Sequence, residues 1–501
     1  MKYNNLTDLV KGLGSTRPNE QFVSEISTGR ILTYWEFYQM VQVRASYLRQ
    51  CGVNVHDKVG LMYKNSIEFM VDFFAILENQ AIVVPINPSL KKGELKYIFQ
   101  DANIKYIIVE CSEVESVYLF ADSINKWKIN NETSIIEIDD HMTEDTRPDN
   151  LIEGTAIILY TSGSTGKAKG VMLTHCNLLN EVQNIKLAHA LMVKDKVLCI
   201  LPWFHINGLV ITMLTPLFVG HEMVIAEKFS QSHFWQWIDD YQITWFSGVP
   251  TIYVYLLAGS DYNEHNSLRF ARSASSSLPV KVLREFEERY HVPVIESYGM
   301  TEGGSQLTSN PIPPKIRKAG SVGLPYGLEV RVVNDESQVC CEDEVGEVQF
   351  RGKSISDGYY KKKEETDCAF DEGWLKTGDV GYLDVDGYLF LVGRKKELIN
   401  RSGEKFSPKE IDELLYQYKG IKMAAAVGVP DEVRGEEVVA FCVPNEGVEL
   451  SADEIVMFCR KNLADFKVPK EIIFVDELPV GGNGKVQRLK LTEKYEERKM
   501  L

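Results

Sequence analysis

The chain has 501 residues, of which 44% are apolar and 25% charged, and its formal net charge is −16. This length and composition predict a globular protein of about three domains with several apolar cores. The negative charge argues against a surface that coats nucleic acid, so an anionic ligand would depend on locally placed lysines and arginines.

Nine cysteines are scattered along the chain without a metal-binding spacing, which favours reduced thiols and a cytoplasmic location. The first residues lack the apolar core of a signal peptide. The longest apolar tract, residues 209–219, is interrupted by Thr212, Thr215 and Pro216. We therefore expect no membrane span.

The first 110 residues alternate between helical and strand-like patterns. Apolar residues recur at helical spacing from Thr33 to Gln50, and Thr33 and Glu36 are placed as a capping box. Strand-like segments at 59–62, 81–86 and 106–109 are separated by helical segments at 69–77 and 95–99. This alternation predicts a parallel α/β layer. Residues 112–150 are polar and acid-rich, and we expect irregular surface there.

The segment from residue 156 to 171 carries the strongest local signal. An apolar strand runs into a loop, residues 161–170, that holds four hydroxyl side chains, three glycines and two lysines. Backbone N–H groups, hydroxyls and lysine charge suit a triphosphate. The spacing is not that of a P-loop, because Ala168 stands five positions after Gly163 and no Ser or Thr follows Lys167. A flexible turn is the alternative for such a loop taken alone.

A second apolar strand, residues 293–297, ends in another polar cluster. Tyr298, Thr301 and Glu302 suit an aromatic base, a phosphate oxygen and a divalent cation respectively. A polar turn at the end of a strand is the alternative reading of this cluster.

The string from Tyr160 to Gly170 resembles the signature loop of the adenylate-forming superfamily, which includes acyl-CoA synthetases, aryl-CoA ligases, luciferases and adenylation domains. Residues 298–302, 373–379, 387–399 and 478–488 are similar to further motifs of that superfamily, in the same order. The resemblance implies an ATP-dependent acid–thiol ligase of the acyl-CoA synthetase branch. Such an enzyme activates a carboxylic acid to an acyl-adenylate with release of pyrophosphate and transfers it to CoA, using ATP, Mg²⁺ and CoA.

The resemblance also implies the roles of individual residues. Tyr298 would stack on adenine, Thr301 would contact a phosphate and Glu302 would bind Mg²⁺. Asp379 would accept from both ribose hydroxyls, which suits a carboxylate, with Arg394 close by. The complete set of expected nucleotide- and thiol-site residues is Thr161, Ser162, Gly163, Ser164, Thr165, Gly166, Lys169, Ala274, Ser275, Glu296, Ser297, Tyr298, Gly299, Asp379, Arg394 and Gly403.

Two lysines near the C-terminus have implied roles in the two half-reactions. Lys485 would bridge the substrate carboxylate and the α-phosphate as the catalytic lysine, and Lys396 would stand at a hinge. Gly403 lies in a segment that resembles the loop lining the approach of the thiol.

The sequence says least about the identity of the carboxylic acid substrate. His205 follows Phe204 in an apolar stretch, where a lone histidine is commonly a core residue. By resemblance this segment borders the carboxylate pocket, and amino-acid adenylation domains carry an aspartate at this position to hold the substrate ammonium. An amino acid is therefore disfavoured, since a buried ammonium without a carboxylate costs several kcal/mol.

Residues 307–311 resemble the oxalate- and malonate-type branch of CoA ligases, whereas Ser305 stands where that branch would place a histidine. Fatty, aryl and small dicarboxylic acids stay open.

The implied fold is α/β. A large N-terminal domain of parallel sheets with flanking helices and a β-rich subdomain would span residues 1–393, and a small mobile α+β domain would span 394–501. In the small domain, Ser407 with Glu410 and Ser451 with Glu454 are placed as capping boxes.

Two alternatives to the acyl-CoA synthetase function remain: a stand-alone adenylation enzyme that loads a carrier-protein phosphopantetheine, and a non-catalytic nucleotide-binding protein. The intact Lys169, Glu302, Asp379 and Lys485 speak against the second.

Overall fold

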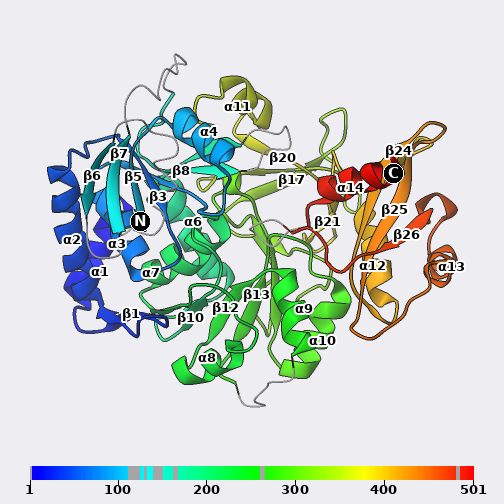
Figure 1. Cartoon of the computed structure of the whole chain (residues 1–501), viewed down its shortest axis with the longest axis horizontal. Coiled ribbons are helices and arrows are strands. Elements are labelled where there is room, and N and C mark those ends of the chain that lie inside the picture. Colours follow the sequence, from blue (N-terminus) through cyan, green and yellow to red (C-terminus); the bar gives the residue numbers. More distant parts are fainter. Residues whose placement is uncertain are drawn as a thin grey trace.

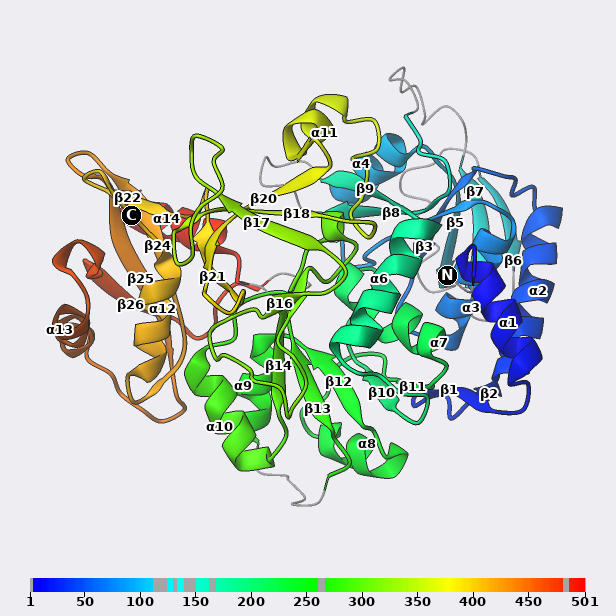
Figure 2. The same cartoon turned by 180° about the vertical axis from the view of Figure 1, so that it is seen from behind.

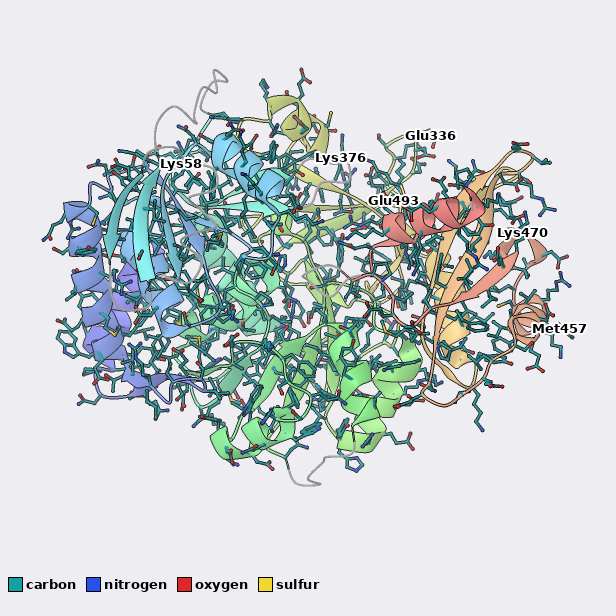
Figure 3. All side chains as sticks on the ribbon, in the orientation of Figure 1. Lys58, Glu336, Lys376, Met457, Lys470 and Glu493 are labelled. Atoms are coloured by element: carbon teal, nitrogen blue, oxygen red, sulfur yellow. The ribbon has the colours of Figure 1, made fainter. Side chains whose placement is uncertain are left out.

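The computed structural model describes residues 3–110, 124–128, 133–138, 150–161, 168–259, 266–480 and 486–500. Figures 1 and 2 show a large body built from the N-terminal part of the chain and a smaller body at one end, built from the residues after β21. Figure 3 shows Met457 and Lys470 projecting outward from the smaller body. No helix in the described ranges is long and apolar enough to cross a membrane.

The first sheet has seven strands in the order β6-β7-β5-β3-β4-β8-β9. Its strands β3, β4, β5 and β8 pair in parallel, which confirms the predicted parallel layer, whereas β5–β7 and β8–β9 are antiparallel. Two strands form a hairpin within the region 112–150, so the prediction of irregular surface is wrong there. The bounds are β3 (Lys58–Met62), β4 (Ile82–Pro85), β5 (Ile104–Glu110), β6 (Ile124–Lys128), β7 (Thr133–Ile138), β8 (Thr155–Thr161) and β9 (Lys169–Thr174).

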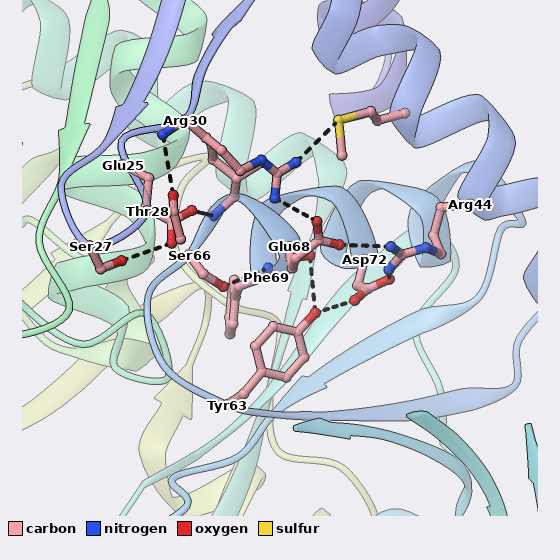
Figure 4. A network of polar contacts seen from close by, with 12 residues as sticks. Glu25, Ser27, Thr28, Arg30, Arg44, Tyr63, Ser66, Glu68, Phe69 and Asp72 are labelled. Carbon is pink, nitrogen blue, oxygen red and sulfur yellow. Dashed lines mark hydrogen bonds and ion pairs between the residues drawn. The ribbon is translucent and has the colours of Figure 1, made fainter. Parts of the chain in front are cut away.

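Four helices accompany this part of the chain: α1 (Leu6–Thr16), α2 (Tyr34–Gln50), α3 (Ile67–Glu78) and α4 (Lys92–Ala102). The predicted capping box of α2 is present, because the Thr33 side chain accepts from the Glu36 N–H and the Glu36 side chain accepts from the Thr33 N–H. A buried ionic network joins α2 to α3 (Figure 4). In it Arg44 contacts both Glu68 and Asp72, which leaves the buried charges of both helices paired.

The second sheet has nine strands in the order β16-β15-β14-β13-β12-β10-β11-β1-β2. Its parallel core brings the carboxyl ends of β12, β13 and β14 side by side, the edge at which α/β sheets bind ligands. The strand bounds are β1 (Gln21–Glu25), β2 (Ile31–Thr33), β10 (Lys196–Cys199), β11 (Glu222–Ile225), β12 (Trp245–Gly248), β13 (Phe270–Ser273), β14 (Val294–Tyr298), β15 (Thr308–Ser309) and β16 (Leu324–Pro325). The helices of this region are α6 (His175–Ala188), the π-helix η3 (Asn207–Leu214), α7 (Thr215–Val219), α8 (Phe234–Tyr241), α9 (Pro250–Ala258), α10 (Val280–Tyr290) and the 3₁₀ turn η4 (Thr301–Gly303).

A third, antiparallel sheet forms the β-rich subdomain, and a fourth forms the C-terminal body. The third contains β17 (Glu329–Val333), β18 (Gly346–Arg351), β19 (Phe370–Asp371), β20 (Trp374–Leu383) and β21 (Leu389–Arg394), with α11 (Lys363–Ala369) nearby. The fourth contains β22 (Ile399–Arg401), β23 (Glu404–Phe406), β24 (Ile421–Asp431), β25 (Gly435–Pro444) and β26 (Glu471–Phe474), with α12 (Pro408–Gln417), α13 (Ala452–Asn462), η5 (Asp465–Lys467) and α14 (Arg488–Met500).

The predicted fold class is thus confirmed, whereas the boundary between residues 393 and 394 stays a prediction. The prediction of a capping box between Ser407 and Glu410 is wrong. The Ser407 side chain accepts from the Lys409 N–H, and the Glu410 carboxylate instead pairs with Lys467. At α13 the Ser451 side chain does accept from the Glu454 N–H.

Candidate functional site

A cavity that is partly open to solvent lies between the second sheet, the β-rich subdomain and the C-terminal body. Seven of the predicted nucleotide-site residues line it: Ser275, Glu296, Ser297, Tyr298, Gly299, Asp379 and Arg394. They come from the turn after β13 and from β14, β20 and β21, so the fold gathers residues that lie up to about 120 positions apart in the sequence.

Asp379 is held between a phenol and a guanidinium. It lies opposite Arg394 in the register of β20 and β21, and the distance from Arg394 Nε to Asp379 Oδ1 is 3.1 Å. The Tyr298 hydroxyl donates to Asp379 Oδ2, and burial together with this carboxylate raises the pKa of Tyr298. The carboxylate is therefore fixed in orientation and keeps acceptor capacity for a pair of neighbouring hydroxyls.

Glu296 is a buried carboxyl group in the wall of the cavity. Its Oε1 accepts from the Leu278 N–H at 3.1 Å, while Oε2 makes no hydrogen bond to any described residue. Burial raises its pKa to about 7. A buried acceptor of this kind suits an N–H donor of a base, because an unsatisfied buried oxygen is costly.

The turn after β13 departs from the glycine pattern at Ala274. The left-handed backbone falls on the next residue, Ser275, whose φ is +75°, and Ala274 itself is buried. Ser275 Oγ accepts a hydrogen bond of 3.1 Å from Asn207 Nδ2. Asn207 opens the π-helix η3, a rare helix type that is frequent at functional sites.

Glu302 lies in the 3₁₀ turn η4 together with Thr301, and both are buried. The Tyr359 hydroxyl donates to Glu302 Oε1 at 2.8 Å, and Lys169 Nζ lies 5.1 Å from the centre of the Tyr359 ring. Tyr359 thereby links the predicted metal ligand to the predicted phosphate lysine. The sequence-based reasoning missed Tyr359, because nothing in residues 358–360 indicates that they meet Glu302.

This donor set fits Mg²⁺. No group of three or more His, Cys, Asp or Glu side chains within the described ranges is arranged to hold a metal, and Mg²⁺ in nucleotide enzymes needs only one or two carboxylates beside the phosphates. Glu302 Oε2 would hold the ion, since Oε1 already accepts from Tyr359.

The phosphate loop lies only partly within the described residues. Ser162, Gly163, Ser164, Thr165 and Gly166 lie outside them. The two ends of the loop, Thr161 and Lys169, face each other in the antiparallel register of β8 and β9. The loop therefore closes a hairpin, unlike a P-loop, which joins a strand to a helix.

His205, expected to border the carboxylate pocket, stands two residues before Asn207 and is not among the residues that line the cavity. Burial lowers its pKa to about 4, and its Nε2 makes no hydrogen bond to a described residue. The imidazole is therefore neutral at pH 7, and no charge on it complements a substrate ammonium.

The C-terminal body contributes the remaining wall of the cavity through α12 and the segment that begins at Val486. Lys485 lies outside the described residues, but Val486 and Arg488 line the cavity. Contacts between α10 and α12 join the two bodies, since the Val280 N–H donates to Glu413 Oε2 at 3.3 Å.

Two predicted residues lie elsewhere in the C-terminal half. Gly403 is exposed at the tip of the β22–β23 hairpin and is not among the lining residues, and Lys396 lies in the turn between β21 and β22.

Residues 14–360 match the family model of AMP-binding enzymes, and residues 410–485 match the model of their C-terminal domain. The chain belongs to the AMP-binding enzyme family. This AMP-binding enzyme is 35% identical to oxalate–CoA ligase of Arabidopsis thaliana over 97% of its own length and 98% of that relative. It is 44% identical to sulfoacetate–CoA ligase of Cupriavidus necator over 68% of its length and 67% of the relative. Among solved structures, ATP-bound MatB from Rhodopseudomonas palustris superposes with a TM-score of 0.88 at 27% identity, covering 98% of this chain and 99% of that one.

These findings confirm the predicted family and the acid–thiol ligase class, with ATP and CoA as reactants. The roles of the individual residues in this AMP-binding enzyme remain predictions.

Proposed function

We propose that this AMP-binding enzyme adenylates a carboxylic acid that carries no amino group, and transfers the acyl group to CoA. The observation that carries the proposal is the cavity in which Tyr298, Asp379 and Arg394 meet the turn at Ser275 and the segment that begins at Val486. The first three residues suit a nucleoside, Ser275 is hydrogen-bonded to Asn207, two residues from His205, and the segment that begins at Val486 directly follows the proposed catalytic Lys485.

In the first half-reaction an oxygen of the substrate carboxylate attacks the α-phosphorus of ATP, and the bond to the bridging oxygen of pyrophosphate breaks. Carboxylate and phosphates are all anionic, so the protein must position them and neutralise their charge. Lys169 would neutralise the outer phosphates, Lys485 the carboxylate and α-phosphate, and Glu302 would hold Mg²⁺. Glu296 Oε2 would accept from the adenine amino group.

In the second half-reaction the thiol of CoA attacks the acyl carbonyl, and AMP leaves. No cationic group is required between carboxylate and phosphate in this step, so rotation of the C-terminal domain about Lys396 is a physically sensible way to bring Gly403 to the site. A carrier-protein phosphopantetheine would undergo the same chemistry and is the alternative acceptor. The cytoplasm stays the predicted location.

The test is pyrophosphate release from ATP with a panel of carboxylic acids, followed by thioester formation with CoA or with carrier protein as acceptor. We expect release with one or more non-amino acids, little release with any standard amino acid, and thioester formation with CoA. A standard amino acid as the best substrate would contradict the argument from His205. Thioester formation with carrier protein alone would select the alternative acceptor.

A further inference from the structure

The two bodies of the enzyme meet where α10 of the large body lies beside α12 of the smaller one (Figures 1 and 2). Polar contacts cross this junction in both directions. The Val280 N–H donates to Glu413 Oε2 at 3.3 Å, and Lys281 Nζ donates to the Tyr416 carbonyl oxygen at 3.0 Å. Each contact joins a charged side chain of one helix to the backbone of the other.

Helix α10 begins without a cap of its own. Pro279 stands at its N-cap position, where the side chain has no acceptor atom, and no acidic residue stands in its first turn. The first N–H groups of a helix have no partner within the helix, and a carboxylate near them also complements the positive end of the helix dipole. Glu413 of the other body provides this carboxylate.

The end of α12 has the opposite deficiency, since no basic residue stands in its last turn. The last carbonyl groups of a helix lack partners within the helix, and a lysine can satisfy one of them. Lys281 does so at Tyr416, and it brings positive charge to the negative end of the dipole. The two helices therefore complement each other's ends, one with an acid and the other with a base.

This junction adjoins the wall of the cavity. Leu278, two positions before the residue that Glu413 contacts, donates its N–H to Glu296 Oε1. Glu296 and Glu413 both line the cavity. The segment that leads into α10 is thus bonded to a carboxyl group of the large body at one N–H, and to a carboxyl group of the smaller body two residues later.

The arrangement of the bodies suits the first half-reaction of the proposed function. Val486, directly after the proposed catalytic Lys485, lines the cavity, whereas Gly403 is not among the lining residues. The thiol step would need Gly403 at the site. The proposed rotation about Lys396 would move α12 relative to α10, and the contacts between the two helices would have to break.

We propose that Glu413 and Lys281 form a latch that holds the smaller body in the pose for adenylation and opens before each thiol step. The inference rests on the proposed function and names the residues that set the balance between its two half-reactions. Both are positioning residues, because they act by placing the segment that follows Lys485. Such a latch is reversible, since a charge at a helix end changes an equilibrium by about 30-fold at most.

The experiment measures the two half-reactions separately in Glu413→Ala and Lys281→Met. ATP–pyrophosphate exchange uses acetate, malonate, benzoate or octanoate, whichever gives the fastest wild-type rate. Thioester formation starts from the synthetic adenylate of the same acid and CoA. We expect exchange to slow on the order of 10-fold in each variant, while thioester formation stays at the wild-type rate or rises. Glu413→Gln keeps an acceptor oxygen and should lose less than Glu413→Ala.

Hydrogen–deuterium exchange of the free enzyme tests the latch without any acid. Opening of the junction should speed amide exchange on both of its sides, in the first turn of α10 and along α12, in Glu413→Ala and Lys281→Met alike. The control is Glu410→Ala, three residues earlier on α12. The Glu410 carboxylate pairs with Lys467 of the same body, so this variant should leave both half-reactions and the amides of α10 unchanged.

Equal losses in both half-reactions would overturn the inference, and so would an unchanged rate of pyrophosphate exchange in both variants. Faster deuterium uptake confined to the first turn of α10 would also overturn it, because Glu413 would then be a local cap. If the wild type supports exchange with no carboxylic acid, the proposed function fails instead. The deuterium measurement then still decides whether Glu413 and Lys281 hold the two bodies together.

Discussion

Tyr359 is the residue whose contacts define the metal side of the site most sharply. Its hydroxyl fixes one oxygen of Glu302, and its ring lies beneath Lys169. Tyr359→Phe keeps the ring and removes the hydroxyl. We expect the Mg²⁺ concentration for half-maximal pyrophosphate exchange to rise about 10-fold, in the range measured for groups that orient metal ligands.

The matched control is Tyr382→Phe, whose ring stacks on Phe390 in the β-rich sheet. An unchanged Mg²⁺ requirement in Tyr359→Phe would mean that Glu302 needs no such support, or does not bind the metal.

Glu181 gives a prediction for stability against pH. Its carboxyl is buried, and its pKa lies near 8 instead of the ordinary 4.5. Between pH 4.5 and about pH 8 the folded protein holds a proton that the unfolded chain releases. The contribution of Glu181 to the free energy of unfolding therefore falls as pH rises through this range. Glu181→Gln cannot lose that proton, and its amide oxygen can still accept from the Gln306 N–H that now reaches Oε1 at 2.7 Å.

The melting temperature of Glu181→Gln relative to wild type should therefore rise between pH 5 and pH 8, by an amount equivalent to a few kcal/mol at most. The buried histidines are common to both proteins and cancel in the difference. Glu285→Gln, at an exposed position of α10, is the control. A difference in melting temperature that does not change with pH would mean that Glu181 titrates normally.

At the scale of single residues, the sequence predicted those residues that stand in contiguous motifs. Tyr298 and Arg394 end the strands β14 and β21, Asp379 lies within β20, and the structure brings the three together. Tyr359 was not predicted, because its contact with the site is made with Glu302, 57 positions away in the sequence.

At the scale of elements, the turn between β21 and β22 bears the proposed hinge. Two backbone bonds shape it, since the Glu397 and Leu398 N–H groups both donate to the Arg394 carbonyl oxygen. Lys396→Pro would fix φ near −65°. We expect this variant to retain ATP–pyrophosphate exchange and to lose most thioester formation. The second rate is measured in a separate assay that starts from synthetic acyl-adenylate and CoA.

Lys396→Ala is the matched control, because it shortens the side chain and leaves the backbone free. If alanine impairs thioester formation as much as proline, the side chain matters and the hinge argument is wrong.

Element predictions succeeded where apolar periodicity was strong and failed where it was weak. The helix after Thr33 and the parallel strands follow from spacing and caps that tertiary contacts reinforce. The β6–β7 hairpin was missed because β6 and the residues around the hairpin are mostly polar, although β7 carries the buried Ile135 and Ile136 and pairs with β5 at the sheet edge. At Ser407 the expected glutamate partner is drawn instead to Lys467, which lies 57 positions away.

For the whole molecule, the arrangement of the two bodies predicts that the half-reactions separate. Lys485→Ala should lower adenylation severely, since its charge is useful only while two anions are brought together. Transfer of a synthetic acyl-adenylate to CoA should continue at a substantial rate. Lys490→Ala, at an exposed position of α14, should affect neither rate. Equal losses in both half-reactions for Lys485→Ala would show that one pose serves both steps.

The pairing of β1 with β11 has a consequence for how the chain acquires its structure. Val23 is aligned with Met223, about 200 residues later, so the first strand to be synthesised has to wait for about 200 further residues before this neighbour exists. At roughly 5–20 residues per second, a ribosome needs on the order of 10–40 s to produce the partner strand. During that time β1 and β2 have an unpaired edge, and contacts of such long sequence separation slow folding. The N-terminal hairpin is therefore the place where we expect the nascent chain to depend most on protection from aggregation.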